Sequence, residues 1–442
     1  MEVNRIEEFK NFELPLQLNI SFKKIYLMLK EYTSENYKNH PFHTSAKTVR
    51  KEVEKFPELI NGFSDLSLLK KHEDLINILL EALFPEILTL NEIKAATVPF
   101  TFTSFKFTKR FENILKNAGD DFELKVRNFE DDQKYIMACT FILANVYNYP
   151  IDLKRPFFFD IPDKKLNLIK HYRVAFNGDF MDIIPTEKAP KITEKDIKNL
   201  LDNFENIDIW KEKFPKDSYI FNGFGIMNLF DVTIDENISA IQNDLLRGDQ
   251  NLNEDLQKHL SQFYNINDLK VGYSVFDYTN SNLEPSSLKK SSSFIITKDQ
   301  NISCSNDNYF CKGIINKIFN NIQPIAISDV EKYGVDSNFN PFYKKLKKEK
   351  IGSIILLPIS TGKNNDLAVL EIASPRPYEL NSINLNKLKD LIPVFESASK
   401  RASEEHLNTL EATIQEHYTS IHPSVKWRFY EAAEKYQKGL LS

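Results

Sequence analysis

Cysteine is scarce in this chain of 442 residues, which contains only Cys139, Cys304 and Cys311. A sparse and odd set of cysteines does not fit the disulfide frameworks that stabilise secreted domains. The N-terminal stretch MEVNRIEEFKNFEL carries acids throughout and lacks the apolar core of a signal peptide. Both absences lead us to expect a reducing compartment, the cytoplasm.

Long apolar runs and a surplus of positive charge are also missing. Leu75–Leu88 and Ile136–Val146 are apolar, but both are shorter than the roughly 18 uninterrupted apolar residues of a membrane span. The formal net charge is −5, so no overall basic field would attract nucleic acid or an anionic membrane. We expect neither partner.

Nucleotide-binding motifs are incomplete. Ser360–Lys363 resembles the end of a phosphate loop, but Leu357 stands where the earlier glycine is needed and Asn364 where Ser or Thr should follow. The stretch Asn222–Gly225 lacks the third glycine of a dinucleotide fingerprint, and a strand bulge is the favoured interpretation.

The charged clusters favour no chemistry either. The lysines of Lys344–Lys350 are typical of a solvated helix face. The acids and histidines between Glu405 and His422 do not repeat at the spacing of helical metal ligands, and no kinase boxes follow them. The sequence therefore predicts no metal, no cofactor and no catalytic residue among these groups.

The most informative segment is Lys350–Ser374, where two short apolar runs flank a polar cluster rich in Gly and Asn. Runs of this length predict strands that are covered on both faces, because a half-exposed strand would alternate with polar residues. Gly and Asn tolerate the backbone of a tight reversal. We expect a hairpin with helices over its sheet.

Further elements are expected on the N-terminal side of this hairpin. They are a strand at Leu269–Tyr278, a loop at Thr279–Ser291, a strand at Ser292–Thr297, a helix at Asn308–Asn320, a strand at Ile322–Val330 and a helix at Phe342–Lys350.

The first 230 or so residues predict helices followed by mixed structure. An apolar stripe runs from Leu18 to Tyr32, and Glu130–Tyr147 has the composition of a buried helix. Asn177-Gly178 predicts a hairpin that joins strands at Lys170–Phe176 and Asp179–Ile184. The further elements expected are strands at Pro156–Ile161 and Ser218–Val232 and a helix at Thr193–Phe204, with a capping box of Thr193 and Asp196.

The C-terminal part predicts a long helix. Apolar residues from Leu388 to Ile421 recur at spacings of three, four and seven, as in a coiled-coil seam. Such a helix commonly forms a homodimer or carries a signal, and the alternative is that it packs on its own sheet. A final helix is expected from Pro423 onward.

Together these patterns predict an α+β chain with four regions. They are a helical lobe at residues 1–95, a mixed region at 96–233, an antiparallel sheet flanked by helices at 234–402 and a helical extension at 403–442.

The order of elements within residues 234–402 resembles the GAF domain. The residues that carry the resemblance are Pro324–Asp329, Gly352–Ile359 and Leu367–Ile372, with Ala368 where the family often has glycine. GAF domains share a scaffold while their pockets bind unrelated molecules, so the resemblance implies a fold and a sensory role of the bacterial sensor type rather than a ligand.

The resemblance also implies a pocket between the sheet and the helices on one of its faces. The candidate lining residues are Tyr273, Phe276, Phe294, Ile315, Ile327, Asp329, Tyr333 and Phe342. Plain core packing is the alternative for most of them. Asp329 ends an apolar strand, so it either bonds a polar ligand or caps the following helix.

Cys304 and Cys311 are the only catalytic candidates, because one branch of the GAF family reduces free methionine sulfoxide with cysteines in this neighbourhood. A reactive thiolate needs a lowered pKa, which Lys312 and the start of the following helix would favour. Unreactive thiols are the alternative.

We therefore expect a non-enzymatic sensory protein that binds an unidentified small molecule and transmits its occupancy through the C-terminal helix to a second copy or a partner. The alternatives are an interaction or scaffold protein whose GAF-like core has no pocket, and a thiol-dependent methionine sulfoxide reductase.

Overall fold

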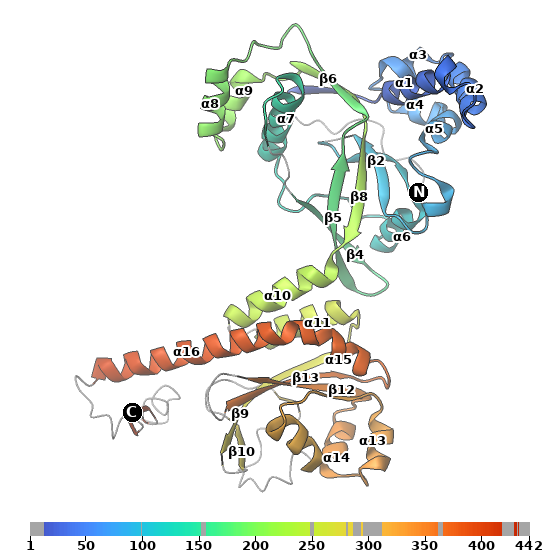
Figure 1. Cartoon of the computed structure of the whole chain (residues 1–442). Coiled ribbons are helices and arrows are strands. Elements are labelled where there is room, and N and C mark those ends of the chain that lie inside the picture. Colours follow the sequence, from blue (N-terminus) through green and yellow to red (C-terminus); the bar gives the residue numbers. More distant parts are fainter. Residues whose placement is uncertain are drawn as a thin grey trace. The chain divides into compact units, whose positions relative to one another are not determined.

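The computed structural model describes residues 13–98, 100–151, 156–247, 252–279, 282–285, 293–294, 312–360, 366–417, 428–430 and 432. The chain divides into two compact units, unit 1 at Met1–Val232 and unit 2 at Thr233–Ser442 (Figure 1). This division lies next to the boundary expected at residue 233, while the finer divisions at residues 95 and 402 stay predictions. Both units contain helices and strands, which confirms the α+β class.

Unit 1 begins with a strand and a group of short helices and continues as mixed structure. Its elements are β1 (Leu16–Asn19), α1 (Lys23–Tyr32), η1 (Glu35–Tyr37), α2 (His43–Val53), α3 (Pro57–Asn61), α4 (Ser67–Lys71), α5 (Glu73–Leu80), η2 (Glu86–Leu88), β2 (Lys94–Val98), β3 (Thr103–Phe107), α6 (Lys109–Ala118), α7 (Asp131–Val146), β4 (Phe157–Asp163), β5 (Leu168–Asn177), β6 (Met181–Pro185), α8 (Glu194–Asp202), α9 (Ile207–Lys213), β7 (Tyr219–Gly223) and β8 (Gly225–Asp231).

The first helix starts later than its apolar stripe suggested. Leu18 lies in β1, which pairs in parallel with β7, and α1 begins only at Lys23. The strand forms because β7 offers it a row of backbone partners, a tertiary effect that local periodicity does not contain. The capping box of Thr193 and Asp196 at the start of α8 is confirmed.

The strands of unit 1 form two sheets, ordered β1-β7-β6 and β3-β2-β8-β5-β4. The predicted hairpin at Asn177-Gly178 is wrong, because β5 and β6 do not pair with each other. Each of them pairs with a different strand: β5 is antiparallel to β8, and β6 is antiparallel to β7. Neither Asn177 nor Gly178 has the positive φ that a tight hairpin turn requires.

The strand pairing is interrupted where the chain leaves one sheet of unit 1 and enters the other. Residues 178–180 on one strand lie opposite residues 224–225 on the other, so three residues face two. Phe224 separates β7 from β8, which belong to different sheets, so the strand bulge favoured for Asn222–Gly225 stays a prediction. The rings of Phe180 and Phe224 stack across the passage, 5.2 Å apart at their centroids.

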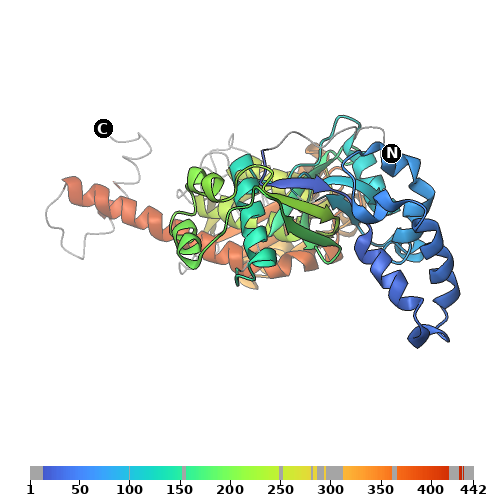
Figure 2. The same cartoon turned by 90° about the horizontal axis from the view of Figure 1, so that it is seen from above.

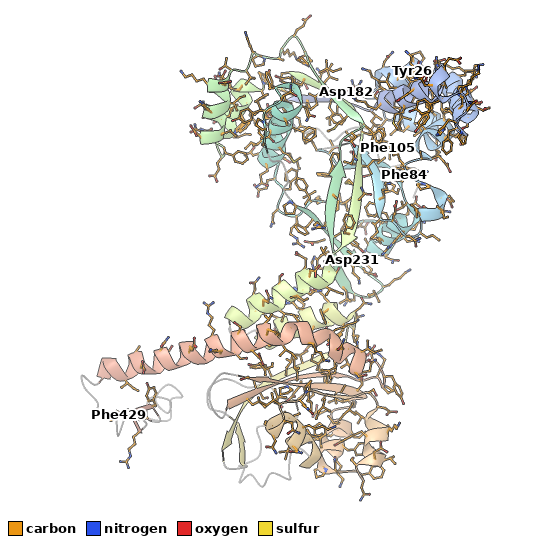
Figure 3. All side chains as sticks on the ribbon, in the orientation of Figure 1. Tyr26, Phe84, Phe105, Asp182, Asp231 and Phe429 are labelled. Atoms are coloured by element: carbon orange, nitrogen blue, oxygen red, sulfur yellow. The ribbon has the colours of Figure 1, made fainter. Side chains whose placement is uncertain are left out.

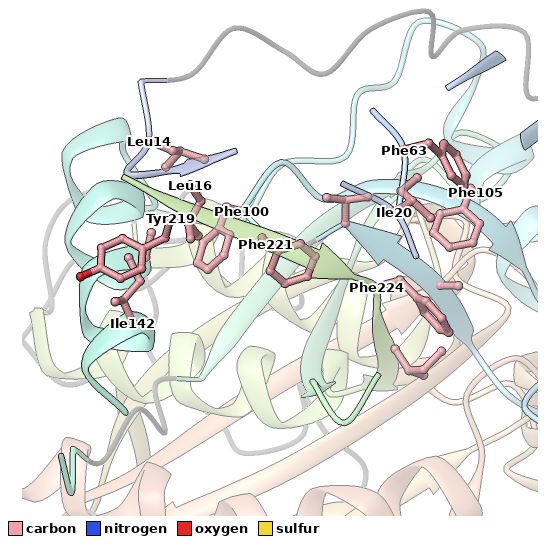
Figure 4. Packing of buried hydrophobic residues seen from close by; sticks show 14 of the residues in the cluster. Leu14, Leu16, Ile20, Phe63, Phe100, Phe105, Ile142, Tyr219, Phe221 and Phe224 are labelled. Atoms are coloured by element: carbon pink, nitrogen blue, oxygen red, sulfur yellow. The ribbon is translucent and has the colours of Figure 1, made fainter. Parts of the chain in front are cut away.

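The main core of unit 1 is rich in aromatic side chains and joins the helical group to the sheets. Phe221 of β7 and Phe224, the residue between β7 and β8, belong to this core, and Phe63 and Phe105 approach from the helical group and β3 (Figure 4). The helices α1 to α5 gather at one end of the unit in both views (Figure 1, Figure 2). Asp182 of β6 forms an ion pair with Lys24 of α1, with 2.8 Å between Oδ1 and Nζ (Figure 3).

Unit 2 contains a second set of helices and strands. Its elements are α10 (Thr233–Arg247), α11 (Leu252–Tyr264), β9 (Lys270–Thr279), β10 (Asn282–Pro285), α12 (Lys312–Ile315), the π-helical turn η4 (Asn316–Asn320), β11 (Ile325–Ile327), α13 (Val330–Asp336), α14 (Pro341–Lys348), β12 (Ser353–Ser360), β13 (Asp366–Ser374), α15 (Ser382–Leu388), η5 (Lys389–Leu391) and α16 (Ile392–His417).

These strands form one antiparallel sheet in the order β10-β9-β13-β12-β11. The predicted hairpin is confirmed, since β12 and β13 pair from Ser353 opposite Ser374 to Ser360 opposite Leu367. The second strand was misplaced: β10 lies inside the expected loop, and Ser293 and Phe294, the described part of the expected strand, are not in a strand. The sequence also missed α13.

Alternate residues of the sheet face two separate apolar clusters, as side chains of a strand must. We call one the Phe395 cluster; it joins the sheet to α10, α11, α15 and α16 through Ile355, Leu357, Ile359, Ala368, Leu370, Ile372 and Phe395. We call the other the Phe342 cluster; it joins the opposite face to α12, η4, α13 and α14 through Ile314, Ile315, Ile318, Ile327, Val330, Phe342, Leu346, Ile354, Leu356, Leu367, Val369 and Ala373. The expectation of a sheet covered on both faces is confirmed (Figure 1).

The C-terminal helix packs on the sheet near its start, where Phe395 and Ala398 of α16 are buried in the Phe395 cluster. The helix then continues to His417 beyond the sheet (Figure 1). The side chains of the seam residues Leu407 and Leu410 are not among those described, and the helix expected from Pro423 lies mostly outside the described residues. A homodimer through this helix stays a prediction.

Within the described parts of the chain, none of the helices combines the length and the apolar character needed to cross a membrane.

The backbone conformation that connects β7 of one sheet to β8 of the other should depend on Gly223. Its φ is +146°, and a Cβ there would lie 2.2 Å from the carbonyl oxygen of Phe180. We expect Gly223→Ala to lower the free energy of unfolding by about 2 kcal/mol or more, because both the backbone and the neighbouring strand resist the methyl group. Urea unfolding followed by circular dichroism measures this.

Gly178→Ala is the matched control. Its φ is ordinary, and the added Cβ would meet the terminal methyl of Met181, which is the far end of a flexible side chain. We expect a change below about 1 kcal/mol. Equal losses for the two variants would contradict the assigned role of Gly223.

Candidate functional site

Most of the residues proposed from the sequence to line a pocket gather on one face of the sheet of unit 2. Phe294, Ile315, Ile327, Tyr333 and Phe342 all belong to the Phe342 cluster or pack against it. Phe342 is fully buried, and Tyr333 contacts its ring edge-on at 6.0 Å between centroids. These five residues come from five different segments between residues 294 and 342, and the fold of that stretch brings them together.

The other aromatic candidates do not join this group. Tyr273 lies on the opposite face of β9, packs against the Phe395 cluster and shares a hydrogen bond of 2.7 Å with Ser399 of α16. The backbone of Phe276 pairs with Leu367, and its side chain is not among those described. Cys304 and Cys311 lie outside the described residues, so their redox role stays a hypothesis.

Asp329 acts as the cap of α13. Its Oδ1 accepts hydrogen bonds from the backbone N–H groups of Glu331 and Lys332 at 3.0 and 3.2 Å. Its Oδ2 accepts one from the Tyr378 hydroxyl at 2.8 Å. The bond from Tyr378, followed by the backbone bond from Lys332, holds the pKa of this carboxyl below its usual value. The capping alternative is confirmed, and a role in ligand binding stays untested.

Glu371 is the residue that the sequence analysis missed. It lies on β13 between Val369 and Ala373, both of which face the Phe342 cluster, and its exposed fraction is 0%. Alternation along the strand places its carboxylate on the same face as the candidates gathered there. A signal was present in the sequence, because an acid inside the apolar run Leu367–Ile372 is almost never fully buried unless it is paired.

Hydrogen-bond donors around Glu371 stabilise the ionised form of its carboxylate. The Ser293 hydroxyl donates to its Oε1 at 2.5 Å, and the backbone N–H of Phe294 donates to its Oε2 at 3.2 Å. Lys345 of α14 is half-buried; burial lowers the pKa of its ammonium group, and the charge of Glu371 opposes this effect. Lys345 thus departs from the solvated helix face expected for the lysine run. This arrangement can keep the Glu371 carboxylate ionised within the core. There the carboxylate can bond a polar group of a molecule that lies against the apolar face.

Unit 1 contains a charged cluster of a different kind. Asp160 of β4 receives the Arg127 guanidinium at 2.8 Å from Nε and the Nδ1 of His171 at 2.6 Å. Burial opposes the ionisation of Asp160, but the bonds from His171 and Arg127 outweigh it and hold the pKa of this carboxyl well below its usual range. Since Asp160 and His171 are cross-strand partners, the cluster ties β4 to β5 at the sheet edge.

The thiol of Cys139 is fully buried in α7, and burial raises its pKa, which disfavours a reactive thiolate. Among the residues that the structure describes, His, Cys, Asp and Glu side chains do not gather in groups of three or more that could hold a metal ion.

The chain was compared with known proteins. Its sequence matches no protein-family model, and a search of curated proteins found no match.

Because Asp329 caps α13, we expect the stability of the first turn of this helix to depend on pH. Because the pKa of Asp329 is lower in the folded chain, its contribution is complete above the unfolded pKa of about 4 and is lost as the pH falls through the folded value. We expect Asp329→Ala to speed hydrogen exchange at the first amides of α13 at pH 7, and the difference from the wild type to shrink below pH about 4.

Two variants sharpen this measurement. Asp329→Asn keeps an oxygen acceptor and should exchange at an intermediate rate, while Tyr378→Phe removes only the hydroxyl bond. Exchange rates in α13 that match the wild type in Asp329→Ala would show that the side chain does not hold the helix start.

Proposed function

We propose that unit 2 is a GAF-like sensory module. A small molecule binds over the face of the sheet that carries the Phe342 cluster, and its occupancy biases α16 and thereby a second copy or another partner. The observation that carries this proposal is Glu371, a fully buried carboxylate on an apolar face where five of the sequence candidates gather. A fully buried acid is rare in a protein core, so its presence on the face where the candidates gather supports a role beyond apolar packing.

A route from this face to α16 runs through β9. Neighbouring residues of a strand face opposite sides, so Tyr273 points to the Phe395 cluster while Gly272 and Ser274 point to the Phe342 cluster. The Tyr273 hydroxyl shares its hydrogen bond with Ser399 of α16. A shift of β9 on ligand binding therefore alters a contact with the long helix, which is the differential contact that a two-state switch needs.

A scaffold protein with a filled core is the second candidate. It is favoured by the complete burial of Phe342 and Leu346 of α14, two large side chains that pack against the sheet. The thiol reductase hypothesis depends on Cys304 and Cys311, and unchanged turnover of free methionine sulfoxide after both are replaced by serine would remove it.

Native mass spectrometry of the purified full chain tests the sensory proposal. We expect a complex heavier than the polypeptide and a released small molecule after denaturation. Calorimetric titration of the refolded, ligand-free chain with the released molecule should restore the complex. A chain that carries no molecule and gives no heat with nucleotides, amino acids or amines would favour the scaffold protein instead.

Tyr273→Phe should separate binding from transmission. In the wild type, the released molecule should change hydrogen exchange in the first turns of α16. In the variant we expect an affinity within about threefold of the wild type, because a neutral hydrogen bond on the opposite face contributes little to binding, and a much smaller change in α16.

Two further variants serve as controls. Ser399→Ala removes the same hydrogen bond from the other side, so the double variant should show no additional loss. Tyr264→Phe removes a similar bond, from the Tyr264 hydroxyl of α11 to the Asn384 carbonyl of α15, which involves no residue of β9. Loss of the α16 response in Tyr264→Phe as well would contradict the specific route.

A further inference from the structure

Lysines gather on the exposed side of α13 and α14, the two helices that pack against each other over the Phe342 cluster (Figure 1). Residues 330–350 contain six lysines, three acids and no arginine, so this stretch carries a formal charge of +3 in a chain whose formal net charge is −5. Lys332, Lys344 and Lys348 are exposed and form no ion pair with any described residue. This side of unit 2 therefore has a local positive charge that opposes the net charge of the chain.

Two apolar side chains are exposed next to these lysines. Val335 of α13 is 66% exposed, and Phe339, which follows the helix, is 49% exposed. Glu331 lies one turn before Val335 on α13. Glu331 forms an ion pair with Lys347 of α14 and accepts a hydrogen bond from the Tyr343 hydroxyl at 3.0 Å. The Phe339 ring contacts the Tyr343 ring edge-on at 5.4 Å between centroids, so both apolar side chains lie beside α14.

The backbone at Phe339 is strained. Its φ is +51°, a left-handed conformation that is unfavourable for a residue with a large side chain. A half-exposed ring recovers only part of the free energy that full burial of a phenylalanine would give. Strained backbone of this kind is concentrated at functional sites, which favours a role for the exposed part of the ring.

The chemistry of this surface favours lipid headgroups over a protein or a nucleic acid. All cations of the stretch are lysines, whose ammonium groups are hydrated point charges that require no fixed partner geometry, whereas protein interfaces are depleted in lysine and enriched in arginine. Single-stranded nucleic acids bind along grooves that offer successive aromatic rings, but the neighbour of Phe339 here is the aliphatic Val335. Lysines around an exposed phenylalanine are typical of proteins that attach to an anionic bilayer.

We propose that this surface docks on an anionic lipid bilayer. We call it the Phe339 surface, and it consists of Lys332, Val335, Phe339, Lys344 and Lys348. The two apolar side chains enter the boundary between headgroups and acyl chains, while the lysines stay among the headgroups. The negative charge of the rest of the chain opposes the docking only weakly, because charges farther away than a Debye length of roughly 8 Å are screened at physiological salt. This inference goes beyond the sensory proposal and does not depend on it.

Flotation of the full chain with lipid vesicles tests the docking. The vesicles consist of phosphatidylcholine alone or of an equal mixture of phosphatidylcholine and phosphatidylglycerol. We expect the chain to float with the anionic vesicles and not with the neutral ones, and to dissociate at about 1 M salt, where screening is strong. Equal binding to both kinds of vesicle, or binding to neither, would overturn the proposal.

The double variant Lys344→Gln, Lys348→Gln tests the cations. We expect its binding to anionic vesicles to weaken about tenfold or more, since each lysine near an anionic surface contributes a factor of about five. The matched control is Lys195→Gln, Lys198→Gln on the exposed side of α8 in unit 1, which changes the net charge by the same amount. This control should bind within about twofold of the wild type. Equal losses in the two double variants would overturn the assignment to the Phe339 surface.

Phe339→Asn tests the apolar contact with a readout that a structural role would not move. Asparagine adopts the left-handed backbone more readily than phenylalanine, so the midpoint of urea unfolding should stay close to that of the wild type. Binding to anionic vesicles should weaken by about fivefold or more, because the ring no longer enters the bilayer. Unchanged vesicle binding would overturn the role assigned to Phe339.

Two polyanions without lipid, a single-stranded oligonucleotide and polyglutamate, test the choice of partner. We expect both to bind more weakly than the anionic vesicles, because neither accepts the apolar side chains. Binding of either polyanion that is lost in Lys344→Gln, Lys348→Gln, together with no flotation of the wild type, would overturn the lipid assignment.

Discussion

The alternation of side chains along β13 is the constraint on which the organisation of unit 2 depends. A one-residue shift in the register of this strand would move Ala368, Leu370 and Ile372 to the other face and turn Glu371 toward the helices α10, α11 and α16. The two apolar clusters therefore fix the register, and the register fixes where the buried charge lies. The candidate site is a consequence of the core and not an addition to it.

The parts of the fold that the sequence predicted are those that local patterns encode. The hairpin of β12 and β13 and the cap of α8 follow from composition and spacing within a few residues. The failures arose where distant segments decide the outcome. β1 exists because β7 pairs with it, and no hairpin forms at Asn177-Gly178 because β5 pairs with β8 while β6 pairs with β7.

The candidate site divides in the same way. Apolar residues such as Phe342 were identifiable as facing a sheet, but which face each strand residue takes depends on the register, so Tyr273 was grouped with residues that lie across the sheet. Glu371 was visible as an acid in an apolar run, yet its partners Ser293 and Phe294 come from a segment more than seventy residues away. Only the fold connects them.

The parallel pairing of β1 with β7 bears on how the chain folds during synthesis. Leu16 lies opposite Tyr219, so β1 waits for its partner strand until β7 has been made. Contacts of such high sequence separation form late and carry a large loop-closure cost. During that interval β1 has no partner strand, and an unpaired strand is the kind of segment that chaperones shield from association with other nascent chains.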